Sequence, residues 1–213
     1  MNEIIKNDDS TLPPGGGGIV IINYGAGNIQ SIKFAFQRLG YKAILSDDPE
    51  VIKNADKVIF PGVGEASSAM NKLKASGLHT LIPQLTQPVL GICLGMQLMC
   101  THTEEGDTEG LGIFDVKVKK FSSDVKVPQI GWNQIEQLSS PLFKDIKEKE
   151  YIYLVHSYYA PVITETIAQS TYGITYSTAL QKDNFYGTQF HPEKSSTVGE
   201  KILENFLSYG IKY

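Results

Sequence analysis

The sequence contains only two cysteines, Cys93 and Cys100, and only four histidines. Two cysteines seven residues apart do not make the disulfide framework of a small secreted domain. The histidines, at positions 79, 102, 156 and 191, form no metal-ligand cluster with the cysteines. We therefore expect no disulfide, no metal site, no bound cofactor and a reduced, cytoplasmic setting.

The sequence also lacks long apolar runs and an excess of positive charge. No run approaches the ~20 apolar residues that a helix needs to cross a bilayer. The first residues, among them Glu3, Asp8 and Asp9, have neither the basic region nor the apolar core of a signal peptide. A net charge of −4 and a pI near 5.6 argue against nucleic acid or an anionic membrane as the main partner.

What the chain does have is enough apolar sequence for one good core, with 41% hydrophobic residues over a length of 213. Residues 1–18 show no periodic apolar pattern and end in Pro13-Pro14 and four glycines, which are costly to order. We therefore expect a flexible extension over residues 1–18 and a single folded domain over residues 19–213.

The first half alternates short apolar runs with segments of helical spacing. The β-branched run 19–22 predicts a buried strand, and the apolar stripe over 29–39 predicts a helix that Gly40 ends. Further strands are predicted at 43–45, 57–60 and 88–92, and helices after Asp48, at about 65–76 and at 78–85. This alternation predicts a doubly wound, flavodoxin-like α/β fold with a mostly parallel sheet.

From about residue 110 the pattern becomes rich in strands. Residues 116–118 and 125–127 alternate apolar with charged side chains, as half-exposed strands do. Other predicted strands cover 131–133, 151–155, 166–168, 178–180 and 185–190. We expect these strands to extend the same sheet in a partly antiparallel way, and we expect a polar loop over 101–110.

Two glycine-containing turns follow predicted strands. Gly25-Ala26-Gly27 lacks the third glycine of the dinucleotide fingerprint, and the chain has no P-loop, so we interpret this segment as a tight turn. The Pro61–Gly64 loop follows the strand 57–60, at the strand end where doubly wound folds bind ligands. Its backbone amides could also face a developing oxyanion. By itself the loop is equally typical of an ordinary turn before a helix.

Cys93 is the residue around which the sequence is arranged. It stands between Gly91 and Gly95, after an apolar run and before a segment with helical spacing. Strand, tight turn and helix form the setting in which a G-x-nucleophile-x-G motif exposes its nucleophile, and a helix amino terminus favours the thiolate. The alternative is a buried structural cysteine. Cys100, on the same predicted helical face, fits that alternative better.

His191-Pro192-Glu193 supplies the partners that a thiol nucleophile needs. In an extended segment, residues two apart face the same side, so Glu193 can orient the His191 imidazole and stabilise its protonated form. Cys93, His191 and Glu193 would then act as nucleophile, base and orienting carboxylate. The alternative is an ordinary His–Glu pair at the surface, but both motifs in one chain favour the catalytic interpretation.

Over residues 19–209 the chain resembles the class I, triad-type glutamine amidotransferases, and within them the glutaminase subunits of imidazole glycerol phosphate synthase. The segments that carry the resemblance are Asn23–Asn28, Phe60–Gly64, Pro88–Leu98, Gly131–Asn133, Val155–Tyr158 and Gln181–Ser195. Cys-Leu-Gly with His-Pro-Glu marks the class, and Pro-Gly-Val-Gly, Gly-Trp-Asn, His-Ser-Tyr and Lys-Asp-Asn-Phe-Tyr-Gly mark the narrower group.

The resemblance implies a mechanism. Cys93 attacks the side-chain amide of glutamine, His191 passes the thiol proton to the departing ammonia, and water releases glutamate from the thioester. The backbone amides of Leu94 and Val63 hold the oxyanion. The Val63 amide turns inward before it donates, so the subunit would be nearly inactive alone.

The resemblance also implies substrate and partner residues. The family's glutamine-holding positions fall on Gly62, Gln97, Glu105, Ser157 and Tyr158, with Glu104 as an alternative to Glu105. Trp132 and Lys182 correspond to residues that face the synthase partner.

That partner is a separate (β/α)8-barrel cyclase, which receives ammonia through a sequestered passage. It makes imidazole glycerol phosphate and an aminoimidazole-carboxamide nucleotide (AICAR), on the path to histidine and purines. A dry passage keeps ammonia unprotonated and nucleophilic. This chain has no (β/α)8 repeat and no phosphate-binding motif for the second half-reaction.

Three alternatives stay open. The same glutaminase chemistry could feed a different acceptor, such as a surface-sugar amidotransferase, and only the partner would discriminate. A stand-alone hydrolase of γ-glutamyl bonds would turn over without any partner. A catalytically silent regulatory subunit is disfavoured, because a silent relative need not keep Cys93, His191 and Glu193.

Overall fold

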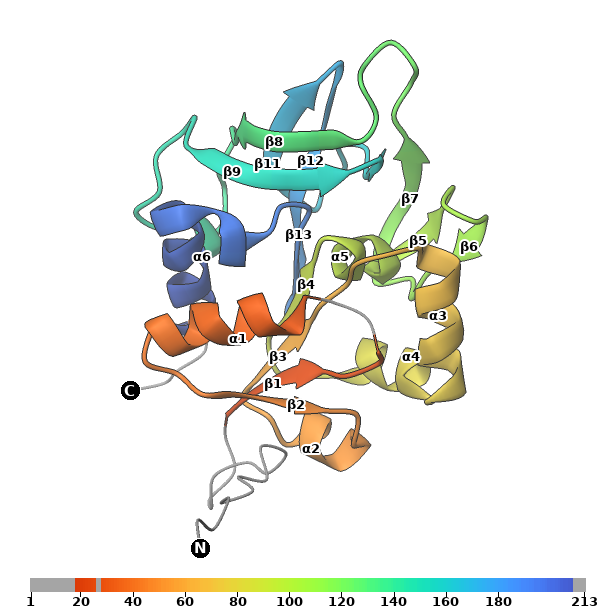
Figure 1. The fold of residues 1–213 in the computed structure, drawn as a ribbon, viewed down its shortest axis with the longest axis vertical. Helices are drawn as coiled ribbons and strands as arrows, with labels where there is room; N and C mark the ends of the chain where they lie inside the picture. The colour runs from red at the N-terminus through yellow and green to blue at the C-terminus, as the bar shows by residue number, and fades with distance from the viewer. Residues whose placement is uncertain (1–17, 26–27, 209–213) are drawn as a thin grey trace, which may run out of the picture.

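The computed structural model describes residues 18–25 and 28–208. The predicted flexible extension, apart from Gly18, and the turn residues Ala26 and Gly27 lie outside the described residues. The centre of the fold is a seven-stranded sheet in the order β11-β12-β13-β4-β3-β1-β2 (Figure 1). Its strands are β1 (Ile19–Ile22), β2 (Ala43–Ser46), β3 (Lys57–Phe60), β4 (Val89–Ile92), β11 (Thr166–Tyr172), β12 (Ile174–Lys182) and β13 (Phe185–Thr188).

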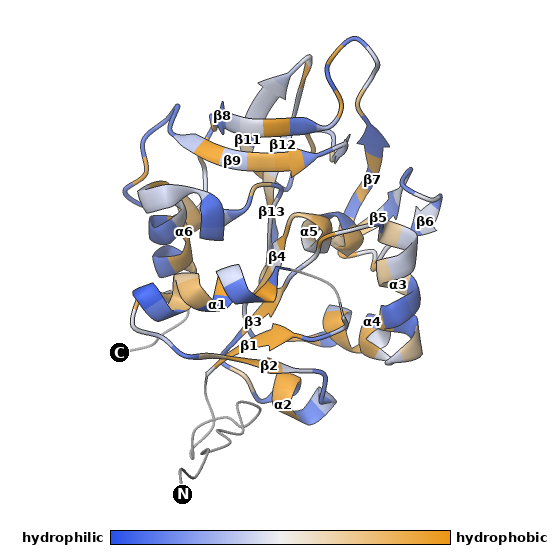
Figure 2. Cartoon of the chain, in the orientation of Figure 1, coloured by the Kyte–Doolittle hydropathy of each residue, from blue (hydrophilic) through white to orange (hydrophobic). Residues whose placement is uncertain are grey.

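Most of this sheet is parallel. Strands β2, β1, β3, β4 and β13 run in one direction, and β12 and β11 continue the sheet in antiparallel fashion. Every residue of β1, β3 and β4 is buried. Strands covered on both faces have no polar side to expose, which explains their mostly apolar sequences, largely orange in Figure 2 although β3 begins with Lys57. The predicted mostly parallel α/β fold is confirmed.

Helices cover both faces of the sheet. Helices α1 (Ile29–Arg38) and α6 (Ser196–Ser208) lie on one face, and α3 (Ala66–Ala75), α4 (Leu78–Leu81) and α5 (Leu94–Met99) lie on the other (Figure 1). The predicted helix over 78–85 is α4 followed by the 3-10 turn η1 (Ile82–Gln84). Among the described residues, no helix combines the length and apolar character needed to cross a bilayer.

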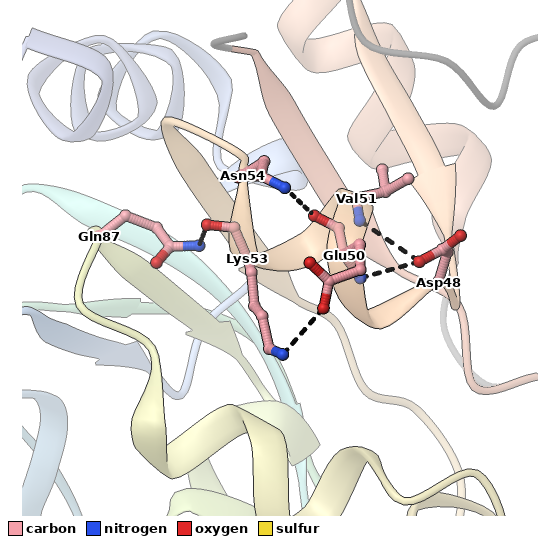
Figure 3. Close-up of polar contacts among 6 residues, drawn as sticks. All are labelled: Asp48, Glu50, Val51, Lys53, Asn54 and Gln87. Carbon is pink, nitrogen blue, oxygen red and sulfur yellow. Dashed lines mark hydrogen bonds and ion pairs between the residues drawn. The ribbon is translucent and has the colours of Figure 1, made fainter.

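The short helix α2 (Pro49–Lys53) is held by polar side chains at both ends (Figure 3). Asp48 Oδ1 accepts the amide N–H of Glu50 at 2.8 Å, which caps the first turn. Gln87 Nε2 donates to the carbonyl of Ile52 at 2.7 Å and to that of Lys53 at 3.4 Å. Since Gln87 comes just before β4, these bonds tie α2 to the entry of the central strand.

The remaining strands do not extend the central sheet, contrary to the prediction. β10 (Tyr158–Tyr159), β7 (Phe114–Lys120), β5 (Cys100–Thr103) and β6 (Thr108–Glu109) form a four-stranded sheet, and β8 (Gln129–Gln134) pairs with β9 (Tyr151–His156) in a separate ribbon. Alternating apolar and polar residues predict a half-exposed strand but do not specify its neighbour. In the described part of the second half, only β11, β12 and β13 join the central sheet.

Two local predictions around Cys100 are wrong. The segment 101–110 is not a loop, because β5 and β6 form an antiparallel pair with His102 opposite Glu109. Cys100 is not on a helical face, since α5 ends at Met99 and Cys100 begins β5. Its thiol remains buried and donates to the Met96 carbonyl at 3.5 Å, as expected of a structural cysteine.

The predicted strand at 125–127 is also absent. The residue that follows it, Pro128, has no N–H to donate to a strand ladder. The side chains of Val125 and Val127 instead pack against an aromatic cluster that includes Phe121 and Tyr176. The apolar positions therefore reflect burial against this cluster rather than a strand.

Candidate active site

Cys93 occupies a strained turn between β4 and α5, at the carboxyl edge of the parallel strands. Its φ of 55° and ψ of −109° lie in a region that residues other than glycine rarely adopt. The Cys93 amide donates to the Thr188 carbonyl at 2.8 Å, so β13 holds the turn in place. The arrangement is the strand–turn–helix that the G-x-Cys-x-G motif predicts.

Gly62 and Gly95 allow the loop after β3 to lie directly on the start of α5. A Cβ at Gly95 would lie 2.0 Å from the Phe60 carbonyl oxygen, and a Cβ at Gly62 would lie 2.5 Å from the Gly95 nitrogen. Neither position has room for a side chain. Gly62 therefore brings the Pro61–Gly64 loop against the Cys93 turn.

His191 and Glu193 form a buried pair beside this turn. His191 Nδ1 lies 2.8 Å from Glu193 Oε1, and the two side chains are 6% and 1% exposed. The segment is not extended as predicted, since Pro192 opens the 3-10 turn η3 (Pro192–Lys194), and this turn brings the two side chains together. Because a carboxylate only accepts, Nδ1 carries the hydrogen, which leaves Nε2 for the hydrogen bond with Cys93.

The surroundings of His191 favour its protonated form. Burial alone would lower its pKa, but the hydrogen bonds to Cys93 and Glu193 and their charges outweigh burial and raise the pKa to about 10. Glu193 Oε2 has no hydrogen-bond partner among the described residues. The imidazolium that forms when His191 accepts the thiol proton would therefore be the chief compensation of the buried carboxylate.

A cavity of about 270 Å³ opens beside Cys93. Its lining includes almost every residue predicted to act on a substrate: Val63, Cys93, Leu94, Gln97, Glu105, Ser157, Tyr158 and His191. Glu193 and Gly62 are not among the residues that line the cavity. The lining residues come from positions 63 to 191 of the chain.

The two predicted oxyanion donors, Leu94 and Val63, both line this cavity. Leu94 begins α5, where backbone N–H groups have no partner within the helix. Val63 is 41% exposed, and its amide has no hydrogen-bond partner in the described part of the chain. Both amides are therefore free to serve a bound group.

One end of the cavity is acidic. Glu105 Oε2 accepts the Ala66 amide at 3.0 Å, whereas Glu104 Oε2 accepts the Lys120 amide and does not line the cavity. Burial raises the pKa of Glu105, and the charge of Glu65 adds to the rise. The hydrogen bond from the Ala66 N–H opposes this effect by lowering the pKa. Of the two candidate carboxylates, the structure therefore brings Glu105 to the cavity.

Gln97 lies deeper in the cavity and is almost fully buried. Its Nε2 donates to the Tyr158 carbonyl at 3.0 Å and to Gln189 Oε1 at 2.9 Å. Both N–H groups are thus used inside the protein, which leaves Oε1 of Gln97 to contact a bound molecule.

The two residues expected to face a partner lie far apart. Trp132 is on the β8–β9 ribbon and is 52% exposed. Lys182 pairs with Phe185 at the opposite, amino-terminal edge of the parallel strands, and its Nζ donates to the Ile113 carbonyl at 2.8 Å. The structure does not bring Lys182 to the surface that Trp132 occupies.

Comparison with known proteins places this site in a family. The glutamine amidotransferase class-I family matches residues 20–209. The chain belongs to the class-I glutamine amidotransferases. It is therefore an enzyme of this family, and the site at Cys93 lies within the matched region.

Similar proteins include imidazole glycerol phosphate synthase subunits HisH. The subunit of Bacteroides thetaiotaomicron is 54% identical over 192 residues, covering 89% of this chain and 98% of the relative. That of Pectobacterium atrosepticum is 49% identical with the same coverage.

Solved structures show the same fold at low identity. A glutamine amidotransferase aligns with a TM-score of 0.70 at 17% identity, covering 89% of this chain and 97% of the other. PurLQS from Thermotoga maritima aligns with a TM-score of 0.69 at 16% identity, covering 91% and 99%.

Two buried polar residues of this amidotransferase site were not assigned a role from the sequence. Gln189 connects Gln97 to Cys93, and His156 donates from Nδ1 to the Tyr158 carbonyl at 2.7 Å. His156 is the last residue of β9 and Gln189 follows directly after β13, and a buried polar residue at the end of a strand is the signal that could have identified them. In the described residues, no cluster of three or more His, Cys, Asp or Glu side chains could hold a metal ion.

The amidotransferase should lose stability in mild acid because of His156. Burial lowers the pKa of His156 to about 4, and the charge of His191 adds to the decrease. The hydrogen bond to the Tyr158 carbonyl opposes this effect by raising the pKa. The unfolded chain takes up this proton near pH 6.5, so the stability that neutral His156 provides is complete above pH 6.5. It is lost as pH falls toward 4, by at most about 3 kcal/mol.

Urea unfolding between pH 7 and pH 4.5 tests this prediction, with His156→Gln as the comparison. The glutamine variant cannot titrate, so its stability should fall less steeply over this range than that of the wild type. Equal slopes for the two proteins would show that His156 does not have the lowered pKa.

Proposed function

We propose that the chain is the glutaminase subunit of an imidazole glycerol phosphate synthase and that it hydrolyses glutamine to glutamate and ammonia. The observation that carries the proposal is the cavity in which Cys93 meets the buried His191–Glu193 pair. The names of relatives about half identical over nearly their whole length support the synthase.

The chemistry follows from the positions of the three side chains. The Cys93 thiol gives its proton to His191 Nε2, and the sulfur attacks the side-chain carbonyl carbon of glutamine. The tetrahedral intermediate collapses as His191 protonates the leaving nitrogen, and ammonia departs. Water, deprotonated by His191, then attacks the thioester, and glutamate leaves with the Cys93 thiol restored.

The remaining cavity residues fit the two ends of glutamine. The free amides of Leu94 and Val63 are proposed to hold the oxyanion, and Gly62 lets the Val63 loop approach. At the far end, the Glu105 carboxylate suits the α-ammonium group, beside Ser157 and Tyr158. Burial and then the charges of Glu105, Glu104 and Glu65 raise the pKa of Tyr158, as expected for an acidic end that attracts a cation.

An exposed apolar face supports a protein partner. On the β8–β9 ribbon, Ile130 lies opposite Val155 and Trp132 lies opposite Tyr153, so all four side chains share one face. Ile130 is 63% exposed and Trp132 52%, and Figure 2 shows hydrophobic stretches on both strands. Exposed apolar surface of this kind marks an interaction site.

Strand β9 connects this face to the catalytic residues. The Tyr153 carbonyl accepts the His191 amide at 3.0 Å, and Ser195 Oγ accepts the Tyr153 amide at 3.0 Å. The Val155 carbonyl lies 3.8 Å from the Cys93 sulfur. A partner bound to the face is therefore well positioned to influence the triad and to receive ammonia.

We propose that this partner is a separate (β/α)8-barrel cyclase that joins the ammonia to its nucleotide substrate. We further propose that the pair works in the cytoplasm, where both free cysteines stay reduced. The alternative, the same glutaminase chemistry serving another acceptor, differs only in the partner.

The test measures glutamate release from glutamine by the chain alone, and then with the cyclase subunit and its nucleotide ligand. Slow hydrolysis alone that rises by orders of magnitude in the complex would support the synthase. Fast hydrolysis that is indifferent to the cyclase would overturn the partner assignment and favour a stand-alone hydrolase or another acceptor.

Replacing Trp132 with serine should weaken cyclase binding by at least about tenfold, because large exposed aromatics carry much of the energy of an interface. Isothermal titration calorimetry measures the affinity. Ile174→Ser, which also changes an exposed apolar residue but lies on β12, is the control. Unchanged binding by Trp132→Ser would exclude the β8–β9 face as the docking surface.

A further inference from the structure

Gln189 lies next to the nucleophile but has no part in the mechanism above. It is fully buried, two residues before His191. Its Oε1 accepts a hydrogen from Gln97 Nε2 at 2.9 Å, and its Nε2 lies 3.8 Å from the Cys93 sulfur. A continuous path of hydrogen bonds therefore runs from the Tyr158 carbonyl through two amide side chains to the thiol.

The orientation of both amides follows from the end of this path. The Tyr158 carbonyl can only accept, so the atom of Gln97 that faces it must be the nitrogen. The same nitrogen faces Gln189, which must present its oxygen in return. The Gln189 amide nitrogen is then directed at sulfur, and a donor rather than an acceptor faces the nucleophile.

The sulfur has different partners in its two protonation states. As a thiol it can donate to the Val155 carbonyl, which lies 3.8 Å away. As a thiolate it has no hydrogen to donate and can only accept, and the Gln189 N–H is in place to supply that hydrogen. The amide therefore favours the ionised sulfur, while the carbonyl favours the neutral one.

We propose that Gln189 is a further active-site residue, which stabilises the Cys93 thiolate by donating an N–H to sulfur and links the nucleophile to Gln97. The proton leaves sulfur for His191 Nε2, and Gln189 itself gains and loses nothing. Gln97 lines the substrate cavity and is hydrogen-bonded to Gln189. Glutamine that contacts Gln97 therefore also affects the position of the Gln189 amide that stabilises the thiolate. This inference rests on the proposed function.

Other ionisable groups also face the sulfur or its surroundings. Glu193 lies in η3 and His191 directly precedes it. Tyr24 follows β1, His156 ends β9, and Glu105 lies in the loop between β5 and β6. Tyr24 donates its hydroxyl to the Pro61 carbonyl at 2.7 Å. None of these groups is removed by a change at position 189, so a comparison of variants there isolates the amide.

The experiment follows alkylation of Cys93 by iodoacetamide in the full chain, from pH 5 to pH 9, with mass spectrometry to distinguish Cys93 from Cys100. Gln189→Met keeps the length of the side chain but removes the donor. We expect the pH midpoint of Cys93 alkylation to rise by about one unit, as expected for the loss of one charge-assisted hydrogen bond, so that the rate at pH values well below the midpoint falls about tenfold.

The matched control is Thr178→Val, which changes a buried hydroxyl that has no partner among the described residues, in a residue whose backbone carbonyl accepts the Gln189 N–H at 2.8 Å. It should leave the rate and the midpoint unchanged. If Gln189→Met fails to fold, as judged by circular dichroism, Gln189→Glu keeps the acceptor for Gln97. Its ionised carboxylate, which repels a thiolate, should raise the pH midpoint of Cys93 alkylation even more.

The outcomes separate the two proposals. If wild-type Cys93 reacts no faster than Cys100, the proposed function fails. If wild-type Cys93 reacts fast and a folded Gln189 variant keeps the same rate and midpoint, only the role of Gln189 is overturned.

Discussion

Replacing Cys93 with serine is expected to lower glutamine hydrolysis by roughly 10⁴-fold or more, the scale on which loss of a nucleophile acts in comparable triads. A serine hydroxyl in this turn is far less ionised than a thiol and attacks an amide poorly. Ammonia-dependent synthesis by the partner should remain intact, since that half-reaction does not need the triad. Both activities are measured in the reconstituted complex.

Cys100→Ser is the matched control for this change. Cys100 is also buried, and burial raises its pKa far above the usual range, so its thiol stays neutral. The control should keep glutamine-dependent activity within a few-fold of the wild type. Loss of both the glutamine-dependent and the ammonia-dependent activities in Cys93→Ser would show that Cys93 is structural.

Replacing Glu193 with glutamine should lower the hydrolysis rate by about 10²- to 10⁴-fold. The substitution keeps the size of the side chain but removes the charge that stabilises imidazolium, and it can reverse the hydrogen bond that fixes the tautomer of His191. The pKa of His191 should fall from its raised value as a result. Steady-state kinetics should show the loss mainly in kcat, because Glu193 does not line the cavity.

Glu204→Gln tests whether any carboxylate near the carboxyl terminus would have the same effect. Glu204 lies on α6 and is 52% exposed, so its replacement should leave kcat unchanged. The proposed role of Glu193 would be refuted by a Glu193→Gln enzyme that keeps its rate within about threefold.

The fold could be predicted where local sequence determines local structure. The β-branched run 19–22 has no polar side, so it predicts a strand that is buried on both faces. Asp48-Pro49 predicts a helix start, because Asp is a preferred N-cap residue and Pro is favoured at the first helical position. The pairing of 114–120 and 129–134 could not be predicted, because an alternating strand fits any sheet with one exposed face. The wrong strand at 125–127 arose in the same way, since valines that pack on Phe121 give the pattern of a strand.

The candidate site could be predicted in part. The glycines around Cys93 and the spacing of His191 and Glu193 follow from local requirements, although η3 rather than a strand brings the pair together. The choice between Glu104 and Glu105 depends on which carboxylate caps α3, a contact across 39 residues. A role for Gln189 could not be assigned, because it depends on the hydrogen bond with Gln97. The two residues are distant in the sequence and become neighbours only in the folded chain.

The most direct test of the account is covalent labelling of the complex by a glutamine analogue that carries an electrophilic ketone at the side-chain carbonyl position. We expect one adduct per chain, on Cys93, which forms more slowly in Glu193→Gln and is prevented by excess glutamine. Labelling of Cys100, or labelling of Cys93 that glutamine does not prevent, would contradict a glutamine site with Cys93 as its nucleophile.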